Sequence, residues 1–443
     1  MKTMATVTTI SDVVCPYCGC LCDDIEVIVE EGKIVGTRNA CILGKRRFLD
    51  SQDPTRIKKP MIRVDGGLKE VSLEEAVQKA AEVLVKAERP LLYGWSMTEC
   101  GAHQAGVALA EELGGIIDNT TSVCHGPSVL ALQEVGISTC TLGEVKNRAN
   151  LIVYWGCNPL QAHPRHLSRY TVYPSGFFRE QGRRDRTLIV VDVRKTDTAK
   201  LADHFVQVEP GGDYELVSAL RLAVNGQKVK SEKVAGVPRE EIEQIAGLMW
   251  SCQFGALFFG LGVTMSDGKN RNIDNVLSLV RDLNAHTKFV IFAMRGHYNV
   301  GGFDEVLSWE TGFPFAVDFG RGFPRYNPGE TTSNDLLMRG EVDAALIVAS
   351  DPTAHFPRKA VEHLAQIPII TIEPFHSLTS ELASVVIPPA IAGIETSGTA
   401  YRMDHVPIRL REVVEPPAGC LPDRQIVQMI LERVRALKRK GEE

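Results

Sequence analysis

Short runs of apolar residues without polar alternation are the main pattern of this chain. Seven such runs lie between residues 90 and 373, each bounded by turn residues: PLLYGW, NLIVYWG, TLIVVDV, ALFFGLG, KFVIFAM, AALIVAS and IPIITIE. Continuous hydrophobicity indicates strands that are buried on both faces, as in a parallel sheet covered by helices. The pattern predicts an α/β protein whose strands divide between two nucleotide-binding-type domains.

Other segments carry hairpin and helix signals. Residues 22–39 read as a β-hairpin, and residues 43–51 are long enough for a helix. A helix is predicted over residues 72–87, where Ser72 is the N-cap and Glu75 completes a capping box. The C-terminal segment 423–440 is predicted to be a docked helix, because its apolar residues form one stripe: Ile426, Ile430, Val434 and Leu437.

Composition narrows the functional classes. The net charge of −6, with no basic block outside the last residues, argues against nucleic-acid binding. No run of 18 apolar residues occurs, and the first residues include no apolar signal segment. The chain has eleven cysteines, and without an apolar signal segment they are expected to be reduced. This predicts a cytoplasmic protein, because structural disulfides are rare in the cytoplasm.

Four cysteines near the N-terminus form a metal-binding pattern. They are spaced Cys15-x₂-Cys18-x₃-Cys22, followed by Cys41. Three thiolates in one loop plus a fourth from a later turn favour a [4Fe–4S] cluster, and zinc is the alternative. Cys20 lies between two ligands and is predicted not to bind. We therefore expect residues 1–60 to form a small iron–sulfur module.

Polar and glycine residues follow several of the predicted strands. In an open parallel sheet, the loops after the strand carboxyl ends form the ligand crevice. Glycines there allow close approach to phosphates, and carboxylates bond ribose or guanine groups. None of the loops is G-x-G-x-x-G, which argues against an ordinary NAD site. The candidate cofactor-binding residues are Gly156, Asn158, Pro159, His163, Asp192, Arg194, Thr196, Pro210, Gly211, Asp213, Gly260, Gly262, Ser350, Asp351, Glu373 and His376.

Several motifs, taken in order, carry a family resemblance: CPYCGCLC…C, VCHGPS, WGCNP…HP, DVRKTDTA, VEPGGDYEL, GLGVT, RGHYNVGG and IVASDP. From about residue 12 to 430 the chain resembles the molybdopterin oxidoreductases, nearest to the formate dehydrogenases. The resemblance implies tungsten or molybdenum held by two molybdopterin guanine dinucleotides, and the residues fit either metal. It also implies two Rossmann-like pterin-binding domains, one of residues 61–123 with about 300–443 and the other of residues 124–299.

The resemblance assigns roles to the residues of the reaction centre. Cys124 is implied to be the thiolate ligand of tungsten or molybdenum, which suits a soft metal. His125 is implied to carry the proton, with a pKa expected near neutrality. Arg295 is implied to hold the substrate carboxylate with its planar fork. Lys45, or alternatively Arg46, is implied to bridge cluster and pterin, and the role of His297 stays open.

The length of the chain narrows the resemblance to one branch of this family. Relatives continue into a β-barrel-like domain, which this sequence is expected to lack, as in the tungsten- or molybdenum-binding subunit of the formylmethanofuran dehydrogenases. That family reversibly reduces CO₂ to formate as the first step of methanogenesis. The resemblance implies partner subunits that supply the missing domain, an amidohydrolase-type site and polyferredoxin-like carriers. The alternatives are a stand-alone formate dehydrogenase and a redox-inactive scaffold subunit of a formyltransferase/hydrolase complex.

Overall fold

The structure, a computed structural model, describes residues 7–442. These residues divide into two compact units, and each is described by itself. Unit 1 comprises residues up to 123 together with 297–402 and 407–443, and unit 2 comprises residues 124–296 and 403–406. In the described part of the chain, no helix has the length and apolar character needed to span a membrane.

The N-terminal part of unit 1 is a small antiparallel sheet followed by a helix. Its strands β1 (Val7–Val13), β2 (Ile25–Glu30) and β3 (Lys33–Arg38) are ordered β1-β2-β3. The β2–β3 pair is the hairpin that the sequence predicted. Helix α1 (Ile42–Asp50) follows directly. A compact apolar core beneath the loop between β1 and β2 consists of Val14, Leu21, Tyr298, Ala392, Ala400 and Leu410.

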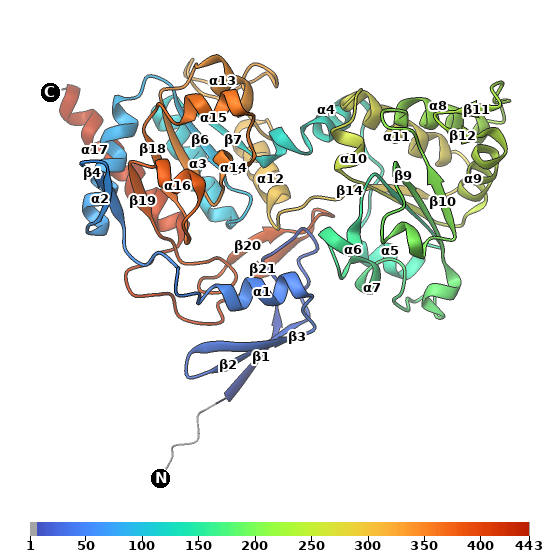
Figure 1. Cartoon of the computed structure of the whole chain (residues 1–443), viewed down its shortest axis with the longest axis horizontal. Helices are drawn as coiled ribbons and strands as arrows, with labels where there is room; N and C mark the ends of the chain where they lie inside the picture. Colours follow the sequence, from blue (N-terminus) through green and yellow to red (C-terminus); the bar gives the residue numbers. More distant parts are fainter. Residues whose placement is uncertain (1–6, 443) are drawn as a thin grey trace, which may run out of the picture. The chain divides into compact units, whose positions relative to one another are not determined.

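The main sheet of unit 1 has nine strands in the order β16-β15-β7-β6-β17-β18-β19-β4-β5 (Figure 1). The five central strands are parallel, and the pairs at both edges are antiparallel. The strands are β4 (Met61–Val64), β5 (Gly67–Glu70), β6 (Pro90–Gly94), β7 (Ile116–Asn119), β15 (Val317–Asp318), β16 (Arg325–Tyr326), β17 (Ala344–Val348), β18 (Ile369–Ile372) and β19 (Val385–Ile387). A separate ribbon pairs β20 (Gly398–Tyr401) with β21 (Pro407–Leu410).

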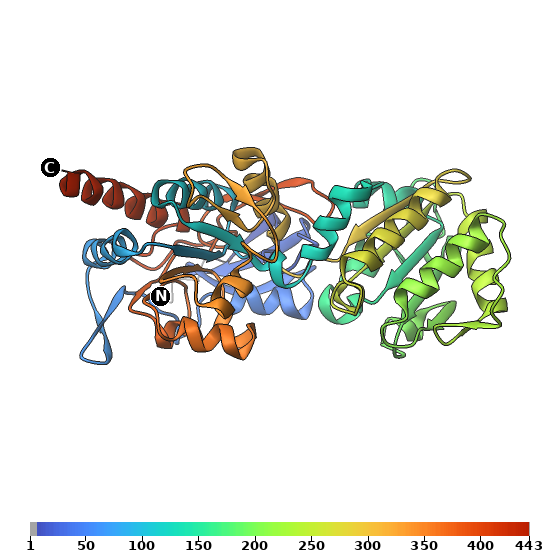
Figure 2. The ribbon, with the colours of Figure 1, turned by 90° about the horizontal axis from the view of Figure 1, so that it is seen from above.

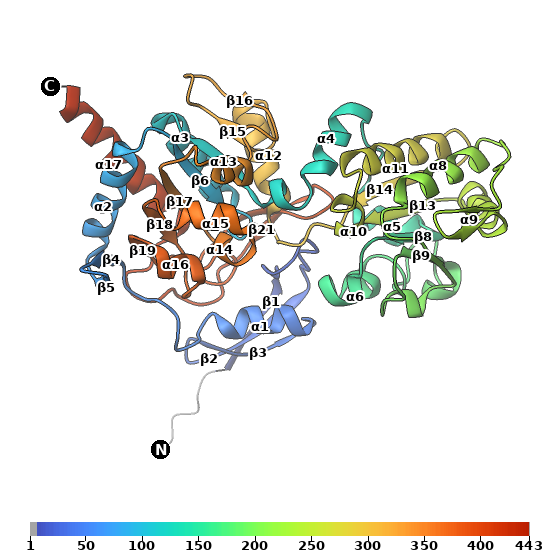
Figure 3. The ribbon, with the colours of Figure 1, turned by 45° about the horizontal axis from the view of Figure 1, so that its top comes forward.

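Helices cover both faces of this sheet. One face packs against α2 (Leu73–Lys86), α3 (Cys100–Leu113), α12 (Val300–Thr311) and α17 (Asp423–Glu442). Helix α17 runs alongside α2 and α3 (Figure 2), which confirms the predicted docking of the C-terminal stripe. The other face packs against α13 (Ser333–Arg339) and α15 (Arg358–Leu364), with the short α14 (Pro352–His355) and α16 (Leu378–Leu382) nearby (Figure 3). Helix α2 has the predicted capping box between Ser72 and Glu75.

Unit 2 is built on five parallel strands in the order β10-β9-β8-β13-β14. They are β8 (Leu151–Trp155), β9 (Thr187–Asp192), β10 (His204–Gln207), β13 (Gly255–Phe259) and β14 (Phe289–Ala293). One face packs against α4 (Gly126–Val135), α8 (Asp213–Val224), α9 (Arg239–Ser251) and α11 (Asn270–Leu283). The remaining elements are short: α5 (Leu142–Arg148), α6 (Pro159–Ala162), α7 (His166–Arg169), α10 (Leu261–Thr264), and the β11–β12 pair (Lys233–Val234, Val237–Pro238).

Both sheets have a topological switch point, where the order of connection reverses. In unit 2 this point lies between β8 and β13, because β9 and β10 extend the sheet to one side and β13 and β14 to the other. In unit 1 it lies between β6 and β17. Ligands of open α/β sheets bind at the carboxyl ends of the strands at such points.

Candidate active site

Backbone hydrogen bonds hold the cysteine loop closed in unit 1. The Cys15 amide donates to the Cys22 carbonyl at 2.9 Å, and the Leu21 amide donates to the Cys18 carbonyl at 3.0 Å. Cys41 is the N-cap of α1, and its sulfur accepts from the Gly44 amide at 3.4 Å. The loop and the start of α1 therefore present their four cysteines from fixed backbone.

The four predicted ligands are electrostatic neighbours. Burial raises the pKa of Cys15 well above its usual range, and the Cys18, Cys22 and Cys41 sulfurs raise it further. A Cβ on Gly44 would lie 2.8 Å from the Cys15 sulfur and 3.7 Å from the Cys41 sulfur, so a side chain there would displace the Cys15 sulfur. Within residues 7–442, no group of three or more His, Cys, Asp or Glu has the geometry for a single metal ion. Four cysteine sulfurs, three from the buried Cys15, Cys18 and Cys22 and one from the partly exposed Cys41, match the donor set of a [4Fe–4S] cluster.

Cys20 is fully buried beside these four. A hydrogen bond from its thiol lowers the pKa of Cys18 and raises that of Cys20 itself. Cys20 is thus an S–H donor to the sulfur of Cys18, one of the four predicted ligands.

The cations of α1 differ in orientation. Lys45 and Arg46 are exposed, and Arg46 pairs with Asp50 at 3.4 Å. Arg47 is half-buried, and its Nε atom is enclosed. The sequence interpretation did not include Arg47.

Cys124 lies in a turn directly before α4 of unit 2. The Thr264 hydroxyl, at the end of α10, donates to the Cys124 carbonyl at 2.9 Å. Helix α4 begins at Gly126 with Pro127 in its first turn, a favoured position for proline. Thr264 is fully buried and therefore fixes the backbone of Cys124, a role that the GLGVT motif had not suggested.

His125 is buried, with only 1% of its surface exposed. Its Nδ1 lies 3.1 Å from the Ser128 hydroxyl, and its ring meets Phe259 edge-on at 6.0 Å. Burial lowers the pKa of His125 to about 3, and the charges of Arg295 and His163 act in the same direction. The expectation that His125 titrates near neutrality is therefore wrong for this environment, and the imidazole is neutral at pH 7.

Arg295 follows β14 and is 7% exposed. Its carbonyl accepts a hydrogen bond from His163 Nε2 at 2.8 Å, which ties His163 to the arginine backbone. The electrostatic effects of Arg295 and His163 on His125 show that these three residues are neighbours. A cavity of about 40 Å³, lined mostly by apolar side chains, adjoins Arg295 and Ser128. The structure thus brings together residues from three separate motifs in unit 2.

Three predicted glycines lie at the switch point of unit 2. Gly156 has φ +58°, and a Cβ there would lie 2.9 Å from the Val263 amide. A Cβ on Gly262 would lie 2.7 Å from the Gly156 Cα, and one on Gly260 would lie 2.6 Å from the Cys157 Cβ. The loops after β8 and β13 thus pack backbone against backbone, a reason for these glycines that the phosphate interpretation did not include.

Some of the predicted polar residues at the same edge of the unit 2 sheet form hydrogen bonds within the chain. Asn158 accepts from the Thr198 hydroxyl at 2.6 Å, while its buried Nδ2 finds no partner in the described part of the chain. Asp213 accepts from Trp155 Nε1 at 2.7 Å. Burial raises the pKa of Asp192, which is half-buried at the end of β9. Of the other candidates, Pro159 and Thr196 are buried, whereas Arg194, Pro210 and Gly211 are exposed.

The switch point of unit 1 has a strained backbone. Gly94 has φ +121°, and a Cβ there would lie 2.1 Å from the Val348 carbonyl oxygen. Trp95 and Ala349 also have positive φ, at +70° and +49°. Such strain in non-glycine residues is typical of functional sites. It supports a ligand site near Ser350, which directly follows Ala349.

The other candidates in unit 1 differ in their environment. Asp351 accepts from the Thr379 hydroxyl at 2.6 Å and from its amide at 3.0 Å, so it ties two loops together. Glu373 follows β18, and its Oε2 atom is buried. His376 is exposed, 3.6 Å from Glu381.

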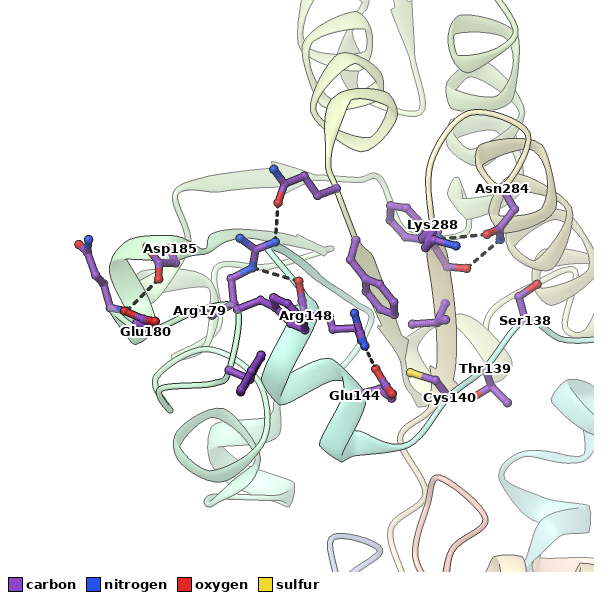
Figure 4. Close-up of a pocket in the computed structure, with 17 residues that line it drawn as sticks. Ser138, Thr139, Cys140, Glu144, Arg148, Arg179, Glu180, Asp185, Asn284 and Lys288 are labelled. Atoms are coloured by element: carbon purple, nitrogen blue, oxygen red, sulfur yellow. Dashed lines mark hydrogen bonds and ion pairs between the residues drawn. The ribbon is translucent and has the colours of Figure 1, made fainter.

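Another hollow, of about 1210 Å³, lies at the amino ends of β13 and β14 (Figure 4). Phe177 and Phe178 line it and are 77% and 51% exposed. Arg148 lies 4.7 Å above the Phe178 ring. Because this hollow is at the opposite ends of the strands from His125 and Arg295, it is separate from the candidate active site.

The motifs and the two switch-point sheets agree with a known family. The sequence model of the family described as Molybdopterin oxidoreductase matches residues 56–433. The chain belongs to the molybdopterin oxidoreductase family. Its relatives in this family include a subunit of tungsten-containing formylmethanofuran dehydrogenase 2 of Methanocaldococcus jannaschii, at 57% identity over 97% of this chain and 100% of the relative. Formate dehydrogenase H of Escherichia coli is 26% identical over 95% of this chain and 68% of that protein.

Solved structures of this oxidoreductase fold confirm the architecture. The formyltransferase/hydrolase complex FhcABCD from Methylorubrum extorquens has a chain with a TM-score of 0.71 at 22% identity, covering 87% of this chain and 100% of that one. Acetylene hydratase from Pelobacter acetylenicus has a TM-score of 0.75 at 15% identity, covering 97% of this chain and 70% of that one. At such identities the likeness shows the fold alone.

Proposed function

We propose that this chain is the redox subunit of a formylmethanofuran dehydrogenase and that it reversibly reduces CO₂ to formate. The observation that carries the proposal is the buried group of His125, His163 and Arg295 beside Cys124 in unit 2. The 57% identity to a subunit of a formylmethanofuran dehydrogenase supports the same conclusion.

The chain fits the cofactors that this function requires. The relatives are named tungsten-containing, and the family is a molybdopterin family. Cys124 offers the soft thiolate that such a metal prefers. The buried, unpartnered Asn158 Nδ2 and the switch-point residues of each unit suit the dinucleotide ends of the pterins. The bound metal and pterins supply a two-electron redox couple, and Cys15, Cys18, Cys22 and Cys41 would hold the cluster through which electrons enter.

The residues of unit 2 have distinct tasks in this reaction. Arg295 binds the carboxylate of formate in bidentate fashion, and its burial strengthens that ion pair. His125 is neutral in this environment, so its Nε2 can accept the proton released when formate is oxidised. A negative centre beside it would raise its pKa from about 3. The cavity of about 40 Å³ beside Arg295 has room for a molecule of the size of water.

The function implies partner subunits. The relatives at 57% and 55% identity are subunits by name, and the FhcABCD structure is a complex. We propose that this chain works in the cytoplasm with an amidohydrolase-type subunit that receives formate, a subunit that closes over the pterins, and polyferredoxin-like electron carriers. A redox-inactive scaffold would have no need of Cys124 and Arg295 together.

X-ray absorption at the tungsten or molybdenum edge tests the proposal. In the purified complex, Cys124→Ala should remove one sulfur from the metal shell and leave the paramagnetic signal of the reduced iron–sulfur cluster unchanged. An unaltered metal shell would show that Cys124 is structural.

A further inference from the structure

An ion pair between Arg56 and Glu395 is buried inside unit 1, and no step of the proposed reaction uses it. The two side chains are only 1% and 2% exposed. Both terminal nitrogens of the guanidinium donate to the carboxylate, and the distance from Nη2 to Oε2 is 2.7 Å. Arg56 lies between α1 and β4, whereas Glu395 lies between β19 and β20. The pair therefore joins two segments that are distant in the sequence.

Arg56 holds the end of the helix that presents Cys41. Its Nη1 donates to the Ser51 carbonyl at 2.9 Å. Ser51 is the C-cap of α1, and Cys41 is the N-cap of the same helix. A Cβ on Gly44 of this helix would lie 2.8 Å from the Cys15 sulfur, so α1 packs closely against a second predicted ligand. The placement of α1 therefore affects two of the four sulfurs.

Glu395 holds the backbone of residues 389–393. Its Oε2 accepts a hydrogen bond from the Ile391 amide at 2.8 Å. The Nη2 of Arg56 donates in addition to the Pro389 carbonyl at 3.0 Å. The ion pair and these two backbone contacts together fix the course of this segment.

Segment 389–393 packs against the cysteine loop. A Cβ on Gly393 would lie 3.0 Å from the Pro16 Cβ, and Pro16 directly follows Cys15. Ala392 lies in the small apolar core beneath the loop between β1 and β2. The ion pair thus connects the two elements that contact the cysteine loop, namely α1 and segment 389–393.

Stability alone is a poor reason for such a pair. Removing two charges from water is costly, and apolar residues of similar volume often give equal or greater stability. An arginine–carboxylate fork instead fixes distance and direction, because its two hydrogen bonds are parallel and planar. A [4Fe–4S] cluster needs such fixed geometry, since each of its four irons takes one cysteine sulfur.

We propose that Arg56 and Glu395 are positioning residues for the iron–sulfur cluster. Their ion pair fixes α1 and segment 389–393 relative to each other and thereby sets the position of Cys41 relative to Cys15. The pair acts through the Ser51 carbonyl on one element and through the Gly393–Pro16 contact on the other. The proposal rests on the cluster of the proposed function.

Conservative variants of the purified complex test this proposal. Arg56→Lys keeps the charge and loses the fork, whereas Glu395→Gln keeps the shape and loses the charge. Both should lose iron per intact complex, and the cluster that remains should give a reduced-state paramagnetic signal with shifted g values. Arg358→Lys and Glu362→Gln change an exposed ion pair of the same unit, so both should match the wild type.

The g values separate positioning from a merely structural role. Breaking a buried ion pair also destabilises a protein, so a lower yield of intact complex decides nothing by itself. A merely structural pair would lower that yield and leave the iron content and the g values of the intact complex unchanged. That result would overturn the proposal.

Gly393→Ala decides if neither variant forms an intact complex. Its Cβ would meet Pro16 and press on the cysteine loop while both members of the ion pair stay in place. Shifted g values would support the coupling of segment 389–393 to the cluster, and wild-type g values with full iron would overturn it. A wild-type complex without iron would instead contradict the proposed function, and with it this inference.

Discussion

Burial determines the protonation state of the residues at the candidate site. The sequence places a histidine after Cys124, and the structure holds that histidine neutral by excluding water and placing Arg295 nearby. No sequence motif reports this exclusion, because it depends on Phe259 and on segments distant along the chain. The sequence therefore predicts which residue types lie at the site, but it does not predict their protonation states.

This neutral histidine should make the chain sensitive to acid. The folded pKa of His125 is about 3 and the unfolded value is 6.5, so the unfolded state binds the proton first as the pH falls. Between pH 7 and pH 5 this costs about 1–2 kcal/mol of stability. His125→Gln should lose less stability over that interval in urea unfolding. The exposed His286→Gln is the control, and equal losses in all three proteins would contradict the assignment.

Arg295 offers a test of substrate binding. Arg295→Lys keeps the charge and loses the planar fork, so kcat/KM for formate should fall roughly 10- to 100-fold, mainly through KM. Steady-state rates of formate oxidation by the complex measure this effect. Arg271→Lys changes an exposed arginine of the same unit and should leave the rates unchanged. Wild-type kinetics for Arg295→Lys would exclude a carboxylate clamp.

At the scale of elements, the apolar runs predict strands well when the strands are central. All seven runs became parallel strands, because burial on both faces leaves a continuous signal. The two-residue strands β15 and β16 at one edge are too short to leave any pattern. Strand order also has no local signal, so the two switch points emerge only from the structure.

The glycines at the unit 2 switch point should be needed for packing. Gly262→Ala would place a Cβ 2.7 Å from the Gly156 Cα, so backbone must shift. We expect a loss of roughly 1–3 kcal/mol, measured by urea unfolding of the chain. Gly247→Ala is the control, because this exposed glycine of α9 has open space around it and should gain stability slightly. A Gly262 variant as stable as the wild type would refute loop-on-loop packing.

The cysteine loop allows ligands and neighbours to be separated. Cys20→Ser should keep the full iron content of the complex, because Cys20 only donates a hydrogen bond to Cys18. Cys41→Ser should lower the iron content, since Cys41 presents its sulfur at the start of α1. Iron analysis with the reduced-cluster signal measures both. Loss of the cluster in Cys20→Ser would make Cys20 a ligand and overturn the set of four.

At the scale of the whole molecule, the predicted site residues are distributed between the two units. Unit 1 carries the four sulfurs, and unit 2 carries Cys124, His125 and Arg295. The family resemblance implied Lys45, or alternatively Arg46, as the link from the cluster, whereas the cation of α1 with an enclosed Nε atom is Arg47. Which of these three neighbouring cations faces inward depends on helix phase, which so short a helix leaves undetermined in the sequence.

The central claim is that this chain reduces CO₂ to formate at a metal bound by Cys124. Carbon-13 NMR of the purified complex, supplied with ¹³CO₂ and a low-potential reductant, measures that reaction directly. The account predicts ¹³C-formate from the wild type and none from Cys124→Ala at equal iron content and equal tungsten or molybdenum content. Formate from the variant at the wild-type rate, or none from a fully metallated wild type, would contradict it.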